Sequence, residues 1–281
     1  MVKNLITAFI ASILCISCLQ ADYIQIKSFN EISDELQNSD KSTLIVFDVD
    51  EVLITTEDHF IHPYADHIFV PLIKKAMAGA ATPEEKKDLE EKLSLSMLQP
   101  KRILIEEETP KLIQMLKNKD IKVIALTSCP TGAFGIIPKV ERWRINHLNS
   151  LDINFASSFP NVNRQFLDEI AVPGKAAPLY EDGVLFSKGY KKGEVLKAFF
   201  KQCNFHPSKV IFIDDLHENL DSVKAELTDL NIEFKGYQYV GATRFFKQEA
   251  DASILNYQFA HLIKNKEWLS DLEVKKRLQT H

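Results

Sequence analysis

The chain has 281 residues, a formal net charge of −5 at pH 7 and a hydrophobic fraction of 45%. This length suits one large domain, or a core with a smaller insert, and the hydrophobic fraction is sufficient for a sizeable core. The chain is acidic and its lysines and arginines are scattered, so the composition argues against a nucleic-acid partner.

Residues 1–21 have the pattern of a signal peptide. Lys3 supplies the positive charge, residues 5–19 are almost wholly apolar, and a small residue precedes Asp22. The apolar run is shorter than the roughly 20 residues that a membrane-spanning helix needs. We therefore expect an exported protein, periplasmic or secreted, with no stable membrane span.

The four cysteines bear on export in two ways. Cys18 could carry a lipid anchor, which is the alternative to cleavage and release, but Cys15 occupies the position where lipoproteins usually have leucine. Cys129 and Cys203 remain after the signal peptide. An exported protein could join them, but one follows a predicted strand and the other ends a predicted helix, at opposite edges of the sheet. We expect both thiols to be free.

The mature chain begins with a helix signal and a buried strand. Ser28 and Glu31 have the spacing of a capping box, which starts a short amphipathic helix. The apolar run 44–47 predicts a buried strand of a parallel sheet. Asp48 and Asp50 follow it, at the carboxyl end where open α/β sheets bind ligands. Two buried like charges are costly without a cation, so this pair predicts a Mg²⁺ site with a nucleophile beside it.

Residues 54–105 interrupt the strand pattern with a mainly helical insert. Residues 68–77 are apolar at helical spacing, and residues 82–85 (Thr-Pro-Glu-Glu) have the pattern of a second helix start. We expect the insert to form a helical cap beside the site. Residues 22–53 and 106–281 are then expected to form the core.

The core resumes with a helix that begins at Thr109 and leads into an apolar strand over residues 121–126, which ends in Thr127 and Ser128. The elements predicted next are a helix at residues 138–149, an edge strand at 153–156 and a hairpin at 178–187 that turns at 181–183.

The last part of the chain repeats the alternation of helix and strand. Lys192 stands at the start of an apolar-periodic helix, and the buried strand 210–213 ends in Asp214 and Asp215. A final strand is predicted at residues 234–240 and a helix at residues 254–263. Alternating strands and helices predict an α/β fold with a parallel sheet and right-handed crossovers.

The polar positions at these strand ends and helix starts follow a fixed order along the chain. It resembles the four motifs of the haloacid dehalogenase-like (HAD) superfamily of phosphotransferases: Asp48-Val49-Asp50, Thr127, Lys192 and Ile213-Asp214-Asp215. The resemblance covers residues 44–240. It implies a Rossmann-like sheet in which the first motif's strand lies between the strands of the second and fourth, with a cap inserted after the first strand. A receiver domain, which has its acidic pair first, does not fit this order.

The resemblance implies a Mg²⁺-dependent phosphatase, of an exported bacterial type, that forms an aspartyl-phosphate. Asp48 would be the nucleophile, and Asp50 would be the general acid and base. Both would join Asp214 and Asp215 around the metal, with Asp215 as the direct ligand and Asp214 acting through water; the reverse assignment stays open. An acid at position 50 is typical of phosphatases and mutases and disfavours dehalogenation.

Three further residues would hold the phosphoryl group. Thr127 would present its hydroxyl, Ser128 its backbone N–H, and Lys192 its positive charge. Lys192 fits the third motif better than Lys191, because the following glycine and leucine then fall in register, and Lys188 is a more distant candidate. The substrate is expected to be a small phosphorylated molecule.

Two alternatives to a phosphatase remain from the sequence. One is a phosphomutase of the same superfamily, and the other is a secreted or surface interaction protein built on a HAD scaffold. Several polar residues near the motifs are interpreted as structural or solvated. Glu51 is expected to be solvated, and the insert histidines His59, His62 and His67 to be surface or substrate-facing residues. Residues 142–144 (Arg-Trp-Arg) are interpreted as a surface helix face, with steering of an anionic substrate as the alternative.

Overall fold

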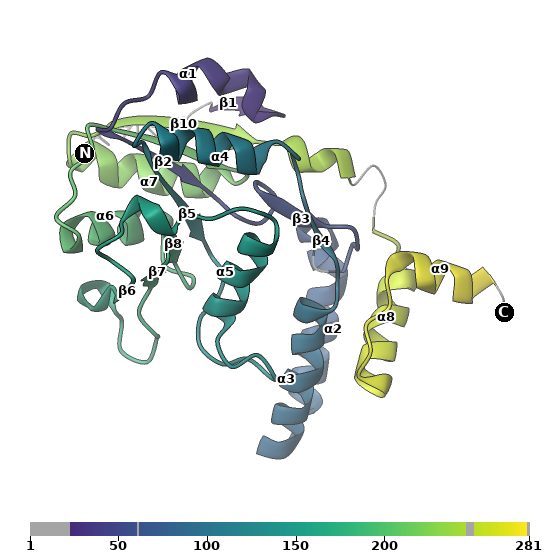
Figure 1. The fold of residues 1–281 in the computed structure, drawn as a ribbon. Coiled ribbons are helices and arrows are strands. Elements are labelled where there is room, and N and C mark those ends of the chain that lie inside the picture. The colour runs from purple at the N-terminus through teal and green to yellow at the C-terminus, as the bar shows by residue number, and fades with distance from the viewer. Residues whose placement is uncertain (1–22, 61, 246–249, 280–281) are drawn as a thin grey trace, which may run out of the picture.

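The computed structural model describes residues 23–60, 62–245 and 250–279 (Figure 1). Its centre is an eight-stranded sheet in the order β1-β10-β9-β2-β5-β8-β7-β6. The first six strands in this order, β1 to β8, pair in parallel with their neighbours. The last two, β7 and β6, are each antiparallel to the strand before them. The fold is α/β with a mostly parallel central sheet, as the alternation of elements predicts.

The strands of this sheet are β1 (Ile24–Ile26), β2 (Thr43–Phe47), β5 (Lys122–Thr127), β6 (Arg164–Phe166), β7 (Leu179–Glu181), β8 (Val184–Phe186), β9 (Lys209–Asp214) and β10 (Glu233–Tyr239). A separate pair consists of β3 (Ile54–Thr56) and β4 (Arg102–Leu104). The helices are α1 (Ser33–Gln37), α2 (Asp66–Gly79), α3 (Pro83–Leu98), α4 (Thr109–Asn118), α5 (Val140–Ser150), α6 (Lys192–Gln202), α7 (His217–Asp229), α8 (Ala252–Asn265) and α9 (Asp271–Gln279).

The central strand β2 is covered by helices on both faces. Ile45 and Phe47 pack into a core with side chains of α1, α4 and α5. Leu44 and Val46 point to the opposite face, into a core with side chains of α6 and α7. All four are fully buried, which explains why the strand is a continuous apolar run and not an alternating one.

The order of the central strands confirms the arrangement predicted for the motifs. β2 pairs in parallel with β5 on one side and with β9 on the other. Because the three strands run in the same direction, their carboxyl ends meet at one edge of the sheet. Asp48, Thr127 and Asp214 are therefore brought to the same edge.

Residues 54–105, here called the insert, are mainly helical, as predicted. β3 and β4 pair antiparallel at its two ends and enclose α2 and α3. The predicted helix start is confirmed: the Thr82 hydroxyl accepts from the backbone of Glu85, whose side chain accepts from the backbone of Thr82. The chain thus leaves and re-enters the core through two adjacent strands.

The C-terminal helices pack against the insert, whereas the sequence assigned them to the core. α8 contacts both α2 and α3. Phe60, Leu255, Leu262 and Trp268 share one buried cluster that is separate from the two cores around the sheet. In Figure 1, α8 and α9 accordingly lie beside the insert helices and away from the central sheet.

One predicted element was wrong. Residues 153–156 form no strand, and a short 3-10 turn covers Ala156–Ser158. The reason is that the Ser158 hydroxyl accepts from the N–H of Val123 and donates to its carbonyl. A side chain thus takes the backbone hydrogen bonds at the start of β5 that a neighbouring strand would otherwise form. The predicted hairpin is confirmed as β7 and β8, with positive φ at Asp182 and Gly183.

Two expectations about the whole chain can also be compared with the structure. Cys129 and Cys203 are free thiols, as predicted. Among the described residues, no helix is both long and apolar enough to cross a membrane. The signal peptide and the alternative lipid anchor on Cys18 concern residues 1–22, which lie outside the described residues.

Candidate active site

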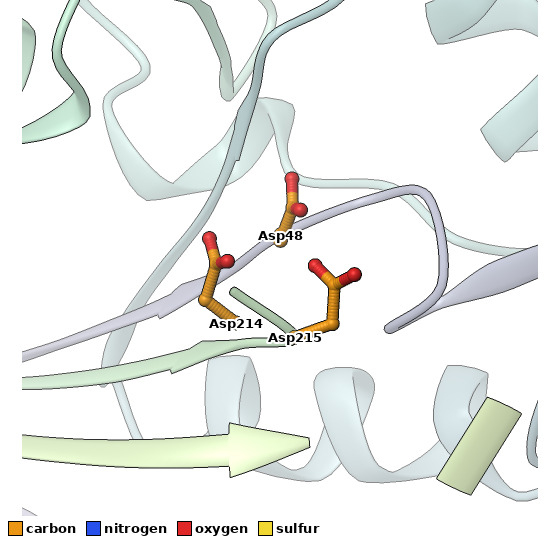
Figure 2. Close-up of side chains that lie close together, drawn as sticks. All are labelled: Asp48, Asp214 and Asp215. Carbon is orange, nitrogen blue, oxygen red and sulfur yellow. The ribbon is translucent and has the colours of Figure 1, made fainter. Parts of the chain in front are cut away.

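Three aspartates meet at the carboxyl ends of β2 and β9. Asp48, Asp214 and Asp215 each offer a carboxylate oxygen within 4.8 Å of the others. Figure 2 shows the three side chains, from the two neighbouring strand ends, gathered around one small region. We call this group the aspartate cluster.

Lys192 is the positive charge of this site. It is the first residue of α6 and 2% exposed, and its Nζ lies 2.8 Å from Asp48 Oδ1 and 2.7 Å from Asp214 Oδ2. Burial alone would lower the pKa of Lys192, but the charges of Asp214 and Asp48 outweigh burial and raise it. Lys191 is exposed, so Lys192 is the lysine that reaches the cluster, as the register of the motif predicts.

Asp214 is fully occupied by donors from the protein itself. Its Oδ2 accepts from Lys192, and its Oδ1 accepts from the backbone N–H of Leu216 and the amide of Asn219, both at 2.9 Å. No donor within the described parts of the chain reaches the carboxylate of Asp215. Asp215 is therefore the carboxylate better able to ligate a cation, in line with its predicted role.

The remaining acids of the cluster are held in an environment that disfavours their charge. Burial raises the pKa of Asp48 to about 7, with Lys192 opposing and Asp214 adding to the shift. Burial and the charges of Asp48 and Asp214 raise the pKa of Asp215 to about 8. Three carboxylates share one buried lysine, so the cluster has more negative charge than the protein neutralises, which is the condition that a bound cation relieves.

Asp50 does not join the other three predicted metal ligands. Its side chain is 48% exposed and turns to the buried Arg144 of α5, whose Nη2 lies 3.0 Å and 3.1 Å from the two carboxylate oxygens. The strand ends at Phe47, so the alternation that would place Asp48 and Asp50 on one side no longer applies. The prediction of Arg144 as part of a surface helix face was wrong, because this guanidinium is 4% exposed.

The two predicted phosphate-binding residues at the carboxyl end of β5 have different environments. Thr127 is buried, and its hydroxyl accepts the N–H of Cys129 at 3.1 Å, which leaves its own proton for another acceptor. Ser128 is exposed and lines a cavity of about 630 Å³ together with Lys191 and Asn219. Two residues of the cavity wall, Ser128 and Lys191, are therefore the sequence neighbours of Thr127 and Lys192.

The polar residues around the motifs differ from expectation. Glu51 was expected to be solvated but is buried, and it pairs with the fully buried His62. His59 pairs with Asp271 of α9, whereas His67 is exposed, as expected. No local sequence pattern indicated these pairs or Asn219, because each contact depends on how the fold brings its segments together.

Comparison with known proteins places the chain in a family. A family model described as "Protein of unknown function (DUF2608)" matches residues 25–275. An uncharacterized protein of Rickettsia conorii is 28% identical over 241 residues, which cover 82% of this chain and 81% of that protein. An uncharacterized protein of Rickettsia typhi is 32% identical over 146 residues, or 51% of this chain and 50% of that protein.

A more distant relative comes from Chlamydia pneumoniae. It is 21% identical over 207 residues, covering 70% of this chain and 69% of that protein, and its name proposes that it is an outer membrane protein. No solved structure gives a significant match to this chain. Since the family model spans most of the sequence, the chain belongs to the family described as "Protein of unknown function (DUF2608)".

Proposed function

We propose that this protein is an exported, Mg²⁺-dependent phosphomonoester hydrolase of the HAD type, acting on a small phosphorylated substrate. One observation carries the proposal. Asp48 lies at the end of the central strand, with one oxygen on a buried lysine and with Asp214 and Asp215 beside it. A nucleophilic carboxylate, a fixed positive charge and further acids that could hold a cation are the parts that phosphoryl transfer needs.

Asp48 would act as the nucleophile. One of its oxygens would bond to phosphorus while the bond from phosphorus to the ester oxygen breaks, which leaves an aspartyl-phosphate and an alcohol. Water would then attack the same phosphorus and release Asp48 and phosphate. Lys192 lies 2.8 Å from Asp48 and supports both steps, because its charge favours the ionised carboxylate and offsets the charge of the phosphoryl group.

The acids of the cluster fit a hard divalent cation. Magnesium binds carboxylate oxygens and keeps several waters, so a small set of acids at an open sheet edge suffices. Asp48 and Asp215 would hold the ion, and Asp214 would act through a water because Lys192, Leu216 and Asn219 occupy its oxygens. A bound Mg²⁺ would screen the nucleophile from the anionic substrate and withdraw charge from the phosphoryl oxygens.

Asp50 would handle the protons. It would donate one to the leaving oxygen in the first step and accept one from the attacking water in the second. Its side chain is half exposed and lies two residues beyond the nucleophile, so rotation away from Arg144 would bring it to a substrate on Asp48. Thr127 would donate its hydroxyl proton to a phosphoryl oxygen, with the N–H of Ser128 beside it.

Export is proposed from the pattern of residues 1–21 and from the name of the Chlamydia pneumoniae relative. Mass spectrometry of the native protein tests it. A mature chain that begins at or near Asp22 supports export, and a diacylglyceryl group on Cys18 would indicate the anchored form. An intact Met1 in cytosolic material would contradict both.

Hydrolysis of a generic aryl phosphate by purified residues 22–281 tests the activity. We expect turnover with Mg²⁺, none in excess chelator, and recovery when Mg²⁺ is restored. Asp48→Asn should be inactive. The control variant Lys191→Gln, which removes an exposed charge next to Lys192, should retain activity on this small substrate. Equal activity with and without chelator would refute the metal dependence.

A further inference from the structure

Each acid of the segment that carries the nucleophile has its own basic partner, and the three partners come from different elements. Asp48 pairs with Lys192 of α6, and Asp50 pairs with Arg144 of α5. Glu51 pairs with His62, which lies in the insert, at 2.9 Å between Oε2 and Nε2. The insert therefore makes direct contact with the segment that follows the nucleophile.

The contact between Glu51 and His62 is buried. Glu51 is 8% exposed and His62 is fully covered. Thr55 of β3 donates its hydroxyl to the Glu51 carboxylate, at 3.2 Å and 3.3 Å from the two oxygens. Beside burial and the charges of Asp48 and Asp214, the charge of Glu51 contributes to the raised pKa of Asp215. A fourth carboxylate thus lies near the aspartate cluster, held by the insert.

The backbone at Glu51 is also unfavourable. Its φ of 63° lies in the left-handed region, which is unfavourable for a residue with a Cβ and readily adopted by glycine. The turn is closed by the Glu51 N–H donating to the Ile54 carbonyl at 2.9 Å and the Ile54 N–H donating to the Val49 carbonyl at 3.1 Å. Glycine would adopt this turn without strain. A glutamate that is both buried and strained at this position therefore indicates a role for its side chain.

We propose that His62 and Glu51 act together as positioning residues for the general acid. The His62 imidazole fixes the Glu51 carboxylate, and through it the tight turn whose preceding residue is Asp50. The insert would then set the position of the proton donor without touching the substrate's reacting atoms. The inference rests on the proposed phosphatase function, in which Asp50 transfers the proton.

The turn explains how a distant side chain can affect proton transfer. Asp50 forms a bridge with Ile54 inside the same turn, so a shift of Glu51 displaces the Asp50 backbone directly. Displacement of a catalytic group by about 1 Å can cost on the order of 10²-fold in rate. The loss should fall on substrates with poor leaving groups, because good leaving groups depart without a proton.

Four variants separate the side-chain role from the turn and from packing. Glu51→Gly relieves the backbone and removes the carboxylate. His62→Leu fills space without a hydrogen bond, and His62→Gln can still donate to Glu51. His67→Gln, an exposed insert histidine, is the matched control. Each is measured with an alkyl phosphate and an aryl phosphate, together with thermal unfolding and Mg²⁺ binding by calorimetry.

We expect Glu51→Gly and His62→Leu to lower kcat for the alkyl phosphate by about 10- to 10²-fold, with a much smaller change for the aryl phosphate and with Mg²⁺ binding retained. Glu51→Gly should melt at or above the wild-type temperature, His62→Gln should recover most of the alkyl activity, and His67→Gln should match wild type. Hydrogen exchange should show faster opening of the Ile54 amide in His62→Leu.

Three outcomes would overturn the inference. The first is Glu51→Gly with wild-type activity on both substrates, and the second is an equal loss on both substrates in either variant. The third is an unchanged hydrogen-exchange rate of the Ile54 amide in His62→Leu. This measurement does not depend on enzymatic activity. Failure of the proposed function is distinct, since wild-type protein would then hydrolyse neither phosphate.

Discussion

The buried guanidinium of Arg144 holds the carboxylate of Asp50 through a single nitrogen, at 3.0 Å and 3.1 Å from its two oxygens. This pair turns Asp50 away from the aspartate cluster and toward α5. The two acids of the first motif therefore occupy different environments: Asp48 is buried against Lys192, and Asp50 is half exposed. Such a difference suits two roles, nucleophile and proton carrier.

Asp50→Asn should separate these roles. The amide cannot donate a proton as an acid does, so hydrolysis of an alkyl phosphate should fall by about 10²–10⁴-fold. Hydrolysis of an aryl phosphate with a good leaving group should fall much less. Steady-state kinetics on both substrates checks the prediction, and an equal loss on both would count against the proton-transfer role.

Lys192 should be essential for stability as well as for chemistry. Lys192→Met leaves Asp48 and Asp214 buried with no positive partner, and breaking a buried ion pair in this way typically costs about 3–5 kcal/mol. The matched variant Lys191→Met removes an exposed charge one residue away and should change the free energy of unfolding by less than about 0.5 kcal/mol. Urea unfolding measures both, and similar values for the two variants would contradict the described environment of Lys192.

Asp215 should make the metal-free protein less stable as the pH rises. Its pKa is raised in the folded state from 3.8 to about 8, so the folded protein keeps a proton that the unfolded chain has released. Stability from this group is full below about pH 4 and is lost as the pH rises toward about 8. In chelator, Asp215→Asn should therefore gain stability relative to wild type as the pH rises from 4 to 8, by up to about 6 kcal/mol for a pKa raised from 3.8 to about 8. Parallel stability curves for the two proteins would refute the shift.

The packing of the C-terminal helices on the insert predicts a further stability difference. Leu262 of α8 is fully buried in the cluster with Phe60 and Trp268, so Leu262→Ala should cost about 2–5 kcal/mol. Leu272 of α9 is 60% exposed, and Leu272→Ala should be close to neutral. Thermal unfolding compares the two. Equal, small effects would mean that α8 is not held against the insert.

The residues of the candidate site that stand at the ends of buried strands could be predicted from the sequence. Asp48, Thr127 and Asp214 each come directly after or at the end of a buried apolar run, and parallel strands bring such ends together. Lys192 could be selected over Lys191 because the glycine and leucine that follow it fall in register with the third motif. These inferences need local pattern and one topological rule.

Other features depend on contacts between distant segments. Arg144 follows Asp50 by 94 positions, and Asp271 lies 212 residues beyond His59, so no local pattern could predict either pair. Glu51 was misjudged for a different reason: its partner His62 is near in sequence, but the burial of both side chains depends on how the insert folds back. The strand expected at residues 153–156 failed because one serine hydroxyl replaced strand pairing at Val123.

Detection of phosphate on Asp48 tests the central claim most directly. Protein is mixed with a radiolabelled phosphomonoester and Mg²⁺, quenched in acid within one turnover, and examined by peptide mapping. We predict a label on the peptide that contains Asp48, released by hydroxylamine as expected for an acyl phosphate and missing in Asp48→Asn. Turnover of the substrate with no label on this peptide, or turnover that persists in Asp48→Asn, would contradict the account.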